Sequence, residues 1–268
     1  MADLQLGVIG AGNMAEAVLR GAFAAGVLSP GAVIAADPSP ARRELFQSQL
    51  GVRIADGNAA PAECPNLLLS VKPQMMPAVL TEIAPRVQPA ARIITIAAGV
   101  RTAVIHERLG GKGRIVRVMP NTPMLVGMGA SALCKGPGAS DDDLAWAERL
   151  FAAGGATVRV EEAMMDAVTA VSGSGPAYFF YLVEAMVQAG VDEGLPAETA
   201  LALAVQTCRG AGELLARTGE PPQALRAKVT SPNGTTQAAI EKLDAAGVKP
   251  ALVAAIRRAA ERSRELGK

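Results

Sequence analysis

Three small residues near the start of the chain have the spacing that a nucleotide phosphate requires. Gly10, Gly12 and Ala15 form the pattern G-x-G-x-x-A directly after a short apolar run, and an amphipathic helical pattern follows. The first glycine permits a tight turn, the second lets the backbone approach a pyrophosphate, and the small third residue keeps the helix close to the sheet. The unpaired amides and the positive dipole end of that helix would face the phosphates. The pattern predicts a dinucleotide site, with a purely steric glycine turn as the alternative.

An acidic residue follows the second apolar run, where such a site usually has a carboxylate for the adenosine ribose. Asp37 in this place would accept a hydrogen bond from a ribose 2′-hydroxyl and would repel a 2′-phosphate. Ser39, Arg42 and Arg43 follow closely and could bind that phosphate if Asp37 points away.

These residues must be positioned by strands and helices that the apolar pattern also predicts. Short apolar runs alternate with helical patterns, which is typical of a parallel sheet with helical crossovers. The expected strands are 6–9, 33–36, 67–71, 92–97 and 115–119, with 130–134 and 157–160 extending the sheet around a helix at 141–153. Beyond residue 161 the strand pattern stops, and helices are expected over 163–171, 177–193, 197–218, 235–246 and 250–266.

The change of pattern predicts an α/β protein with two domains. Residues 1–161 would form a dinucleotide-binding, Rossmann-type parallel-sheet domain, and residues 162–268 an all-helical dimerisation and substrate-binding domain. Several of the helices carry apolar stripes too wide for so small a domain to bury alone. We therefore expect a dimer at minimum, and a compact monomeric helical bundle is the alternative.

Composition excludes several classes of function. Basic and acidic residues number 26 and 25, and no run of Lys or Arg could follow a phosphodiester backbone, which disfavours nucleic acid as a partner. Cys64, Cys134 and Cys208 lack the C-x-x-C spacing of a zinc site or redox pair, and we expect reduced core thiols. With no leader pattern and no run of about 18 apolar residues, a cytoplasmic protein without a membrane partner is expected.

The single histidine, His106, lies in a helical pattern away from any serine or cysteine nucleophile motif, and no metal site is expected. Chemistry supplied by a bound cofactor is what remains. The segments 71–73, 97–99 and 119–123 end strands abruptly and would leave backbone groups free to meet a nicotinamide ring, although each could simply terminate its strand. The segments 172–176 and 230–236 would precede helices and offer hydroxyls and amides to a small carboxylate, with simple helix capping as the alternative.

Taken together, these motifs resemble pyrroline-5-carboxylate reductases. The resemblance covers essentially the whole chain, and the segments that carry it are GAGNMA at 10–15, VKP at 71–73, IAAGV at 96–100, MPNTP at 119–123, VSGSGPAY at 171–178 and VTSPNGTT at 229–236. It implies NAD(P)H-dependent reduction of the ring imine of Δ1-pyrroline-5-carboxylate to L-proline, the last step of proline biosynthesis. It also implies a homodimer through the helical domains, commonly assembled into a pentamer of dimers.

The resemblance further implies roles for individual residues. The cofactor would be bound by Gly10, Gly12, Asn13, Met14, Asn58, Val71, Lys72, Pro73, Asn121 and Thr122, to which the ribose argument adds Asp37 and Ser39. The substrate would be bound by Ser231, Gly234, Thr235, Thr236 and Asn121. The Thr236 hydroxyl, as hydrogen-bond partner of the imine nitrogen, is the expected catalytic group. NADPH is the favoured coenzyme, with appreciable use of NADH.

Two other functions would fit the same architecture. A related two-domain imine or β-hydroxyacid reductase would need a differently equipped site, such as a lysine on the helix after SGSGP, where this chain has Pro176, Ala177, Tyr178 and Phe179. A non-catalytic dinucleotide-sensing protein would need no substrate loop, and the intact TSPNGTT segment argues against it.

Overall fold

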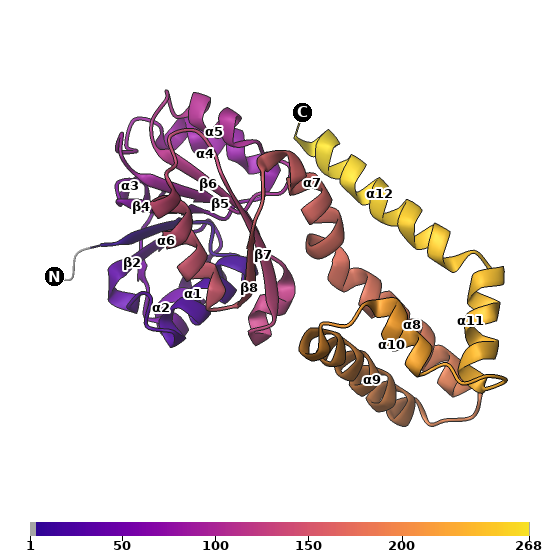
Figure 1. Ribbon diagram of the computed structural model, residues 1–268. Helices are drawn as coiled ribbons and strands as arrows, with labels where there is room; N and C mark the ends of the chain where they lie inside the picture. Colours follow the sequence, from indigo (N-terminus) through magenta and orange to yellow (C-terminus); the bar gives the residue numbers. More distant parts are fainter. Residues whose placement is uncertain (1–3, 268) are drawn as a thin grey trace. The chain divides into compact units, whose positions relative to one another are not determined.

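The computed structural model describes residues 4–267, which form two compact units (Figure 1). The first unit comprises the residues up to 174 together with residues 259–267, and the second comprises residues 175–258. The division expected from the sequence, after residue 161, marks the change from strands to helices and stays a prediction.

An eight-stranded sheet forms the centre of the first unit, in the order β3-β2-β1-β4-β5-β6-β7-β8. The strands are β1 (Leu6–Ile9), β2 (Val33–Ala36), β3 (Arg53–Ile54), β4 (Asn66–Leu69), β5 (Arg92–Thr95), β6 (Arg114–Met119), β7 (Gly129–Lys135) and β8 (Gly155–Arg159). Neighbouring strands are parallel except β6 and β7. The connection 120–128 is too short for a helical crossover, which needs a dozen residues or more, so β7 returns antiparallel. The Rossmann-type sheet is confirmed, with this strand and the two-residue β3 as departures from the expected pattern.

Helices cover both faces of this sheet, which explains why its central strands β1, β2, β4 and β5 are mostly apolar. They are α1 (Asn13–Ala24), α2 (Pro40–Leu50), α3 (Ala59–Ala62), α4 (Met76–Ile83), α5 (Thr102–Arg108), α6 (Asp141–Ala152) and α7 (Met165–Val168). Short 3₁₀ turns lie at Pro30–Ala32, Pro73–Met75, Thr122–Val126 and Glu162–Met164. Leu68 of β4 packs into a core cluster with residues of α1, α2 and α6, whereas Leu67 and Leu69 pack into a second cluster with residues of α4 and α5.

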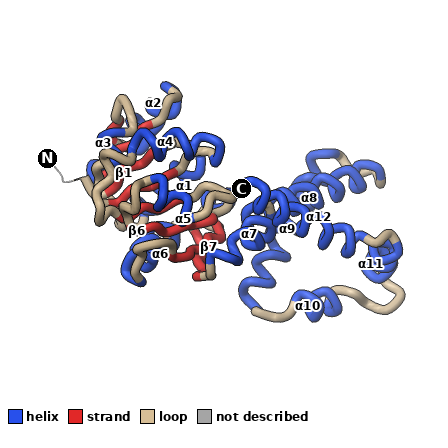
Figure 2. The backbone as a smooth tube through the Cα atoms, turned by 90° about the horizontal axis from the view of Figure 1, so that it is seen from above, coloured by secondary structure: helices blue, strands red, loops and turns tan. Residues whose placement is uncertain are grey.

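The residues described for the second unit form helices and connecting loops, with no strand among them (Figure 2). The helices are α8 (Gly175–Asp192), α9 (Ala197–Thr218), α10 (Pro222–Lys228), α11 (Thr235–Ala245) and α12 (Val248–Leu266), and the last turns of α12 belong to the first unit. The all-helical second part is confirmed, although the short α10 between prolines was not expected. Phe179, Phe180 and Tyr181 are among many exposed apolar side chains on α8 and α9, as helices that pack against another chain would have. Within residues 4–267, no helix is long and apolar enough to cross a membrane.

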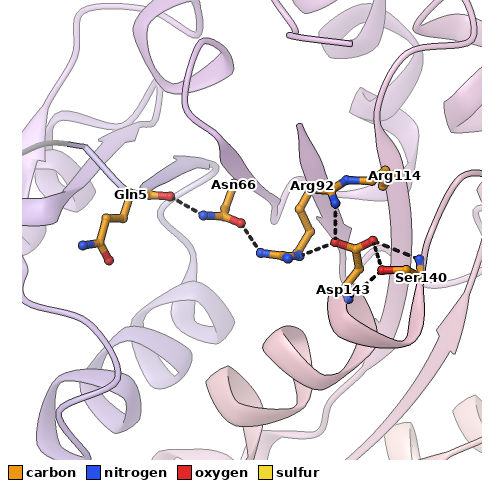
Figure 3. Close-up of polar contacts among 6 residues, drawn as sticks. All are labelled: Gln5, Asn66, Arg92, Arg114, Ser140 and Asp143. Carbon is orange, nitrogen blue, oxygen red and sulfur yellow. Dashed lines mark hydrogen bonds and ion pairs between the residues drawn. The ribbon is translucent and has the colours of Figure 1, made fainter. Parts of the chain in front are cut away.

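A buried ionic network fastens α6 to the amino ends of three strands (Figure 3). Asp143, which is fully buried, forms a capping box with Ser140 at the start of α6 and ion pairs with Arg92 at 2.8 Å and Arg114 at 3.1 Å. Arg92 also donates to the Asn66 side chain at 2.6 Å. Burial alone would raise the pKa of the Asp143 carboxyl, but the Ser140 hydrogen bonds and the two guanidiniums outweigh it and hold this pKa below its usual value. The network therefore lies at the amino ends of the parallel strands, whereas the glycine loop lies at their carboxyl ends.

Candidate functional site

The glycine loop between β1 and α1 has the backbone geometry of a phosphate cradle. Gly10 has a φ of +94°, and a Cβ there would lie 2.6 Å from the carbonyl oxygen of Ser70, so only glycine fits. Gly12 is the N-cap of α1, and no side chain caps this helix end. A Cβ on Gly12 would meet no atom within 4 Å, which leaves open space directly in front of the free amides of the first turn. The loop therefore fits a pyrophosphate.

A cavity of about 340 Å³, here called the central pocket, opens beside this loop at the carboxyl ends of β1, β4, β5 and β6. It brings together eight of the predicted site residues: Gly12, Asn13, Met14, Val71, Lys72, Pro73, Asn121 and Thr122. Ala97, Ala98, Met119 and Gly173 line it as well, and they belong to the segments 97–99, 119–123 and 172–176 that the sequence indicated. A ligand pocket in this place is typical of an open α/β sheet.

A second cavity of about 340 Å³, the flanking pocket, lies on the β2 side of the same sheet edge. Gly10, Asp37 and Asn58 line it among the predicted residues, and Val71 lines both pockets. The Asn58 amide donates to the Glu82 carboxylate at 2.8 Å. Two adjoining pockets on either side of a glycine loop suit the two halves of a dinucleotide.

The Asp37 carboxylate is held by the backbone. Its Oδ2 accepts from the Ala11 amide at 2.7 Å, and its Oδ1 accepts from the Ser39 amide at 2.8 Å. Ser39 therefore contributes its amide to this arrangement, and its place as a coenzyme ligand stays a prediction. The side chain links the end of β2 to the glycine loop, in addition to lining the flanking pocket.

The two arginines that follow Asp37 differ in their surroundings. Arg42 donates to the Glu16 carboxylate at 2.8 Å and to the Ala11 carbonyl, so its charge is already paired. Arg43 donates to the carbonyl oxygen of Asp37 at 2.9 Å and lines the flanking pocket. Of the two cations, Arg43 is the one available to an anion in that pocket.

Asn121 is buried and ties three segments together. Its Oδ1 accepts from the Ala130 amide of β7 at 2.8 Å, and its Nδ2 donates to the Ser172 carbonyl at 3.1 Å. The side chain thus fixes the loop after β6 at the wall of the central pocket. A direct role for Asn121 toward substrate or cofactor stays a prediction.

Most of the segment 172–176 is helical, so the open loop expected in front of a helix is reduced to Ser174, and an anion cup there stays a prediction. The chain passes from α7 through a π-helical turn, η5 (Thr169–Gly173), directly toward α8. The Ser174 amide donates to the Thr169 carbonyl at 2.8 Å, so this donor is already used. A Cβ on Gly173 would lie 2.5 Å from Cε of Met119, so the flexible end of that side chain would have to move.

The segment 230–236 does precede a helix, within the second unit. Gly234 is the N-cap of α11, and no side chain caps the helix. Asn233 has a φ of 56° and donates its amide to the Gln237 side chain at 2.8 Å, while the Gly234 amide donates to the Ser231 carbonyl at 3.1 Å. The amides of Thr235 and Thr236 lie in the first turn of α11, where amides have no partner within the helix. The half-buried Thr236 follows the Gly234 cap by two residues.

Other reactive groups lie outside these sites. His106 is on α5 and lines neither pocket. Burial raises the pKa of the Cys64 thiol to about 11 and that of the Cys134 thiol to about 12, which makes both poor nucleophiles. Across the part of the chain that the structure describes, no three His, Cys, Asp or Glu side chains are grouped as metal ligands.

Comparisons with known proteins agree with this arrangement. Residues 5–99 match the family described as NADP oxidoreductase, coenzyme F420-dependent, and residues 162–266 match the family described as pyrroline-5-carboxylate reductase dimerisation. The chain is 40% identical over 269 residues to the pyrroline-5-carboxylate reductase of Methanosarcina acetivorans, with 100% of both chains covered. It is 43% identical over 274 residues to that of Pseudomonas aeruginosa, again with 100% of both covered.

Solved structures give the same result. A pyrroline-5-carboxylate reductase from Coxiella burnetii superposes with a TM-score of 0.90 at 34% identity, covering 99% of each chain. The Plasmodium falciparum pyrroline carboxylate reductase, whose structure has NADP bound, superposes with a TM-score of 0.89 at 29% identity over 100% of each chain. The match to a dimerisation domain indicates a homo-oligomer, and the full-length identities show that the chain belongs to the pyrroline-5-carboxylate reductase family of oxidoreductases.

Proposed function

We propose that this protein reduces Δ1-pyrroline-5-carboxylate to L-proline, the last step of proline biosynthesis, with NADPH preferred over NADH. The observation that carries the proposal is full-length identity of about 40% to pyrroline-5-carboxylate reductases. The open glycine cradle and its two adjoining pockets support it, because they fit a dinucleotide.

The pockets suggest which residues hold the coenzyme. The amides of Gly12, Asn13 and Met14 lie at the helix end that would bind the pyrophosphate, next to the turn at Gly10. Asn58, Asp37 and Ser39 would contact the adenosine half, whereas Val71, Lys72, Pro73, Asn121 and Thr122 would contact the nicotinamide half. When bound, NAD(P)H supplies the hydride that adds to the imine carbon of the substrate.

The start of α11 is proposed to bind the substrate. The Thr235 amide would hold the carboxylate at the positive end of the helix, with Ser231 completing the loop. The Gly234 amide, which the sequence also suggested for this role, would first have to release the Ser231 carbonyl. The Thr236 hydroxyl would hydrogen-bond to the imine nitrogen and orient it. An unperturbed hydroxyl is a poor acid, so the proton on nitrogen would come from water or from substrate that binds as the iminium. Positioning would supply most of the rate acceleration.

The coenzyme preference is proposed from the charges around the flanking pocket. The Asp37 carboxylate already accepts two backbone amides, and Arg43 lines the pocket. A 2′-phosphate would therefore find a cation within reach. The Plasmodium falciparum relative was solved with NADP, which agrees with this preference.

The assembly is proposed to be a homodimer formed through the helical domain. The proposal extends to a pentamer of such dimers. The exposed apolar side chains of α8 and α9 support an extensive interface. A cytoplasmic location also remains a proposal. It is supported by Cys64 and Cys134, buried free thiols that suit a reducing compartment.

The first test is coenzyme oxidation, followed at 340 nm, with Δ1-pyrroline-5-carboxylate and either NADPH or NADH. Rapid turnover, faster with NADPH at equal concentration, is expected. No turnover despite measurable dinucleotide binding would contradict the proposal and would favour another imine or keto acid substrate, or a dinucleotide sensor.

A further inference from the structure

The last turn of α12 is fastened to α7 inside the first unit. The side chain of Ser263 is almost completely buried, and its Oγ donates a hydrogen bond to Oδ1 of Asp166 at 2.6 Å. A short bond to a carboxylate is stronger than a bond between neutral groups, and this one is partly buried. The end of α12 is therefore held in one position.

The same turn lies against the loop that follows β5, with no side chain between the two backbones. Gly99 has a φ of +77°, and a Cβ there would lie 3.0 Å from both Cβ of Leu266 and the carbonyl oxygen of Ser263. A Cβ on Gly267 would lie 2.2 Å from the carbonyl oxygen of Gly99. Glycine on both sides is what allows this close approach.

The loop that contacts α12 also forms a wall of the central pocket. Ala97 and Ala98, immediately before Gly99, line that pocket. Pro73 lines the central pocket as well as a separate hollow of about 170 Å³, to which Leu266 and Gly267 contribute. The end of α12 thus contacts the loop after β5, of which Ala97 and Ala98 line the central pocket, and it shares a hollow with the loop after β4.

We propose that the C-terminal turn of α12 positions the loop after β5 and thereby sets the affinity for the dinucleotide. Ser263, Asp166 and Gly99 are positioning residues, because none of them lines either pocket. A loop that is already ordered has less conformational entropy to lose when the ligand binds. The inference rests on the proposed function for the identity of the ligand.

The test measures dinucleotide binding without turnover. NADPH is titrated into three proteins: the wild type, Ser263→Ala and a chain ending at Arg262. Binding is followed by the fluorescence of NADPH. We expect the Kd to rise about threefold to tenfold for Ser263→Ala, which is less than the full loss of a hydrogen bond to a charged group because this bond acts on the dinucleotide only through the loop. A rise of more than about tenfold is expected for the shortened chain, which loses the backbone contacts as well.

Matched variants separate positioning from general destabilisation. Asp166→Asn keeps an acceptor for Ser263 and is expected to bind NADPH within about twofold of the wild type, whereas Asp166→Ala should match Ser263→Ala. The double variant Ser263→Ala/Asp166→Ala should be no weaker than either single variant, because both remove the same bond. Ser48→Ala is the control for the loss of a serine hydroxyl: it removes an exposed 2.8 Å bond to the Glu44 carbonyl within α2 and should leave the Kd unchanged.

Kinetics and mass measurements complete the test. The KM for NADPH should rise in parallel with the Kd, with kcat at saturating coenzyme nearly unchanged, and light scattering should give the same oligomer as the wild type. An unchanged Kd in Ser263→Ala and in the shortened chain, with only a lower melting temperature, would overturn the proposal. Wild-type protein that binds NADPH but does not reduce the imine would contradict the proposed function, while the titrations would still decide this inference.

Discussion

The Asp37 carboxylate lies 2.7 Å from the Ala11 amide, as a hydrogen-bond acceptor inside the glycine loop. Its other oxygen accepts the Ser39 amide, so both oxygens are used by the backbone. An acidic residue at the end of the second strand usually binds the adenosine ribose. In this chain it connects β2 to the phosphate cradle, and the prediction that it opposes a 2′-phosphate does not follow from its charge alone.

Replacing Asp37 by asparagine should weaken the binding of NADPH and of NADH to a similar extent. The amide of the new side chain cannot accept the second backbone N–H, and the loss of a hydrogen bond to a charged group costs about 1.5–3 kcal/mol. We expect the Kd values of NADPH and NADH to rise together, by about tenfold or more. Fluorescence titration with each coenzyme measures the two values.

The ratio of the two Kd values distinguishes the loop role from a ribose role. If Asp37 acted mainly on the ribose, Asp37→Asn would weaken NADH binding and strengthen NADPH binding. A rise of the NADPH preference by more than about tenfold would therefore contradict a role limited to the glycine loop.

Arg43 is expected to carry the preference for NADPH. It lines the flanking pocket, whereas Arg42 is paired with Glu16. Arg43→Gln removes the cation while keeping donors, and should raise the KM for NADPH by about tenfold with little change for NADH. Steady-state kinetics with both coenzymes measure this. An equal rise of the KM for NADPH and for NADH would show that Arg43 stabilises the glycine loop rather than binding the 2′-phosphate.

The fold was largely predictable because its main signals are local. Apolar runs buried on both faces and the glycine turn predict the parallel strands and α1, and the end of the strand pattern predicts the helical part. The antiparallel direction of β7 was not predicted, because the direction of a strand depends on the length of the connection before it and not on its pattern of apolar residues. The two residues of β3 are too few to show any periodicity.

The site was less predictable, because side-chain direction is a tertiary property. The glycine and proline motifs correctly indicated which loops gather around the central pocket. The sequence could not show that Asp37 turns toward Ala11, since that contact joins segments 26 residues apart. It also suggested a free helix start at 172–176, where the π-helical turn uses the Ser174 amide. The contact of Gly99 with the end of α12 had no sequence signal at all.

Thr236 is expected to affect turnover rather than folding. Thr236→Ala removes the hydroxyl proposed to orient the imine nitrogen and should lower kcat/KM by about tenfold to a hundredfold, the effect of one hydrogen bond used in the transition state. Thr236→Ser keeps the hydroxyl and should retain most activity. Steady-state kinetics with melting curves make the comparison. Near-normal kinetics in Thr236→Ala would remove Thr236 from the mechanism.

Asp143 should matter for stability and not for coenzyme binding. It is fully buried and pairs with Arg92 and Arg114 at the amino ends of their strands (Figure 3). None of the three residues lines either pocket. Removing one member of a buried ion pair costs about 3–5 kcal/mol, because the partners lose their counter-charge. Because the Arg92 and Arg114 side chains keep some contact with water, Asp143→Ala should lower the free energy of unfolding by at most about this amount, measured by chemical denaturation, with an unchanged Kd for NADPH. Asp141→Ala, at an exposed carboxylate on the same helix, is the control.

The same carboxyl should contribute to acid sensitivity. Its pKa in the folded protein is held below the usual value, so it binds a proton more readily in the unfolded chain, and folding is stabilised at pH values above the unfolded pKa of about 3.9. This contribution is lost as the pH falls through the lower pKa of the folded state. We expect the difference in unfolding free energy between wild type and Asp143→Asn to be constant between about pH 7 and 5 and to shrink below about pH 4. Denaturation curves at these pH values measure it; a difference that already shrinks near pH 6 would show that another group, and not Asp143, controls the response.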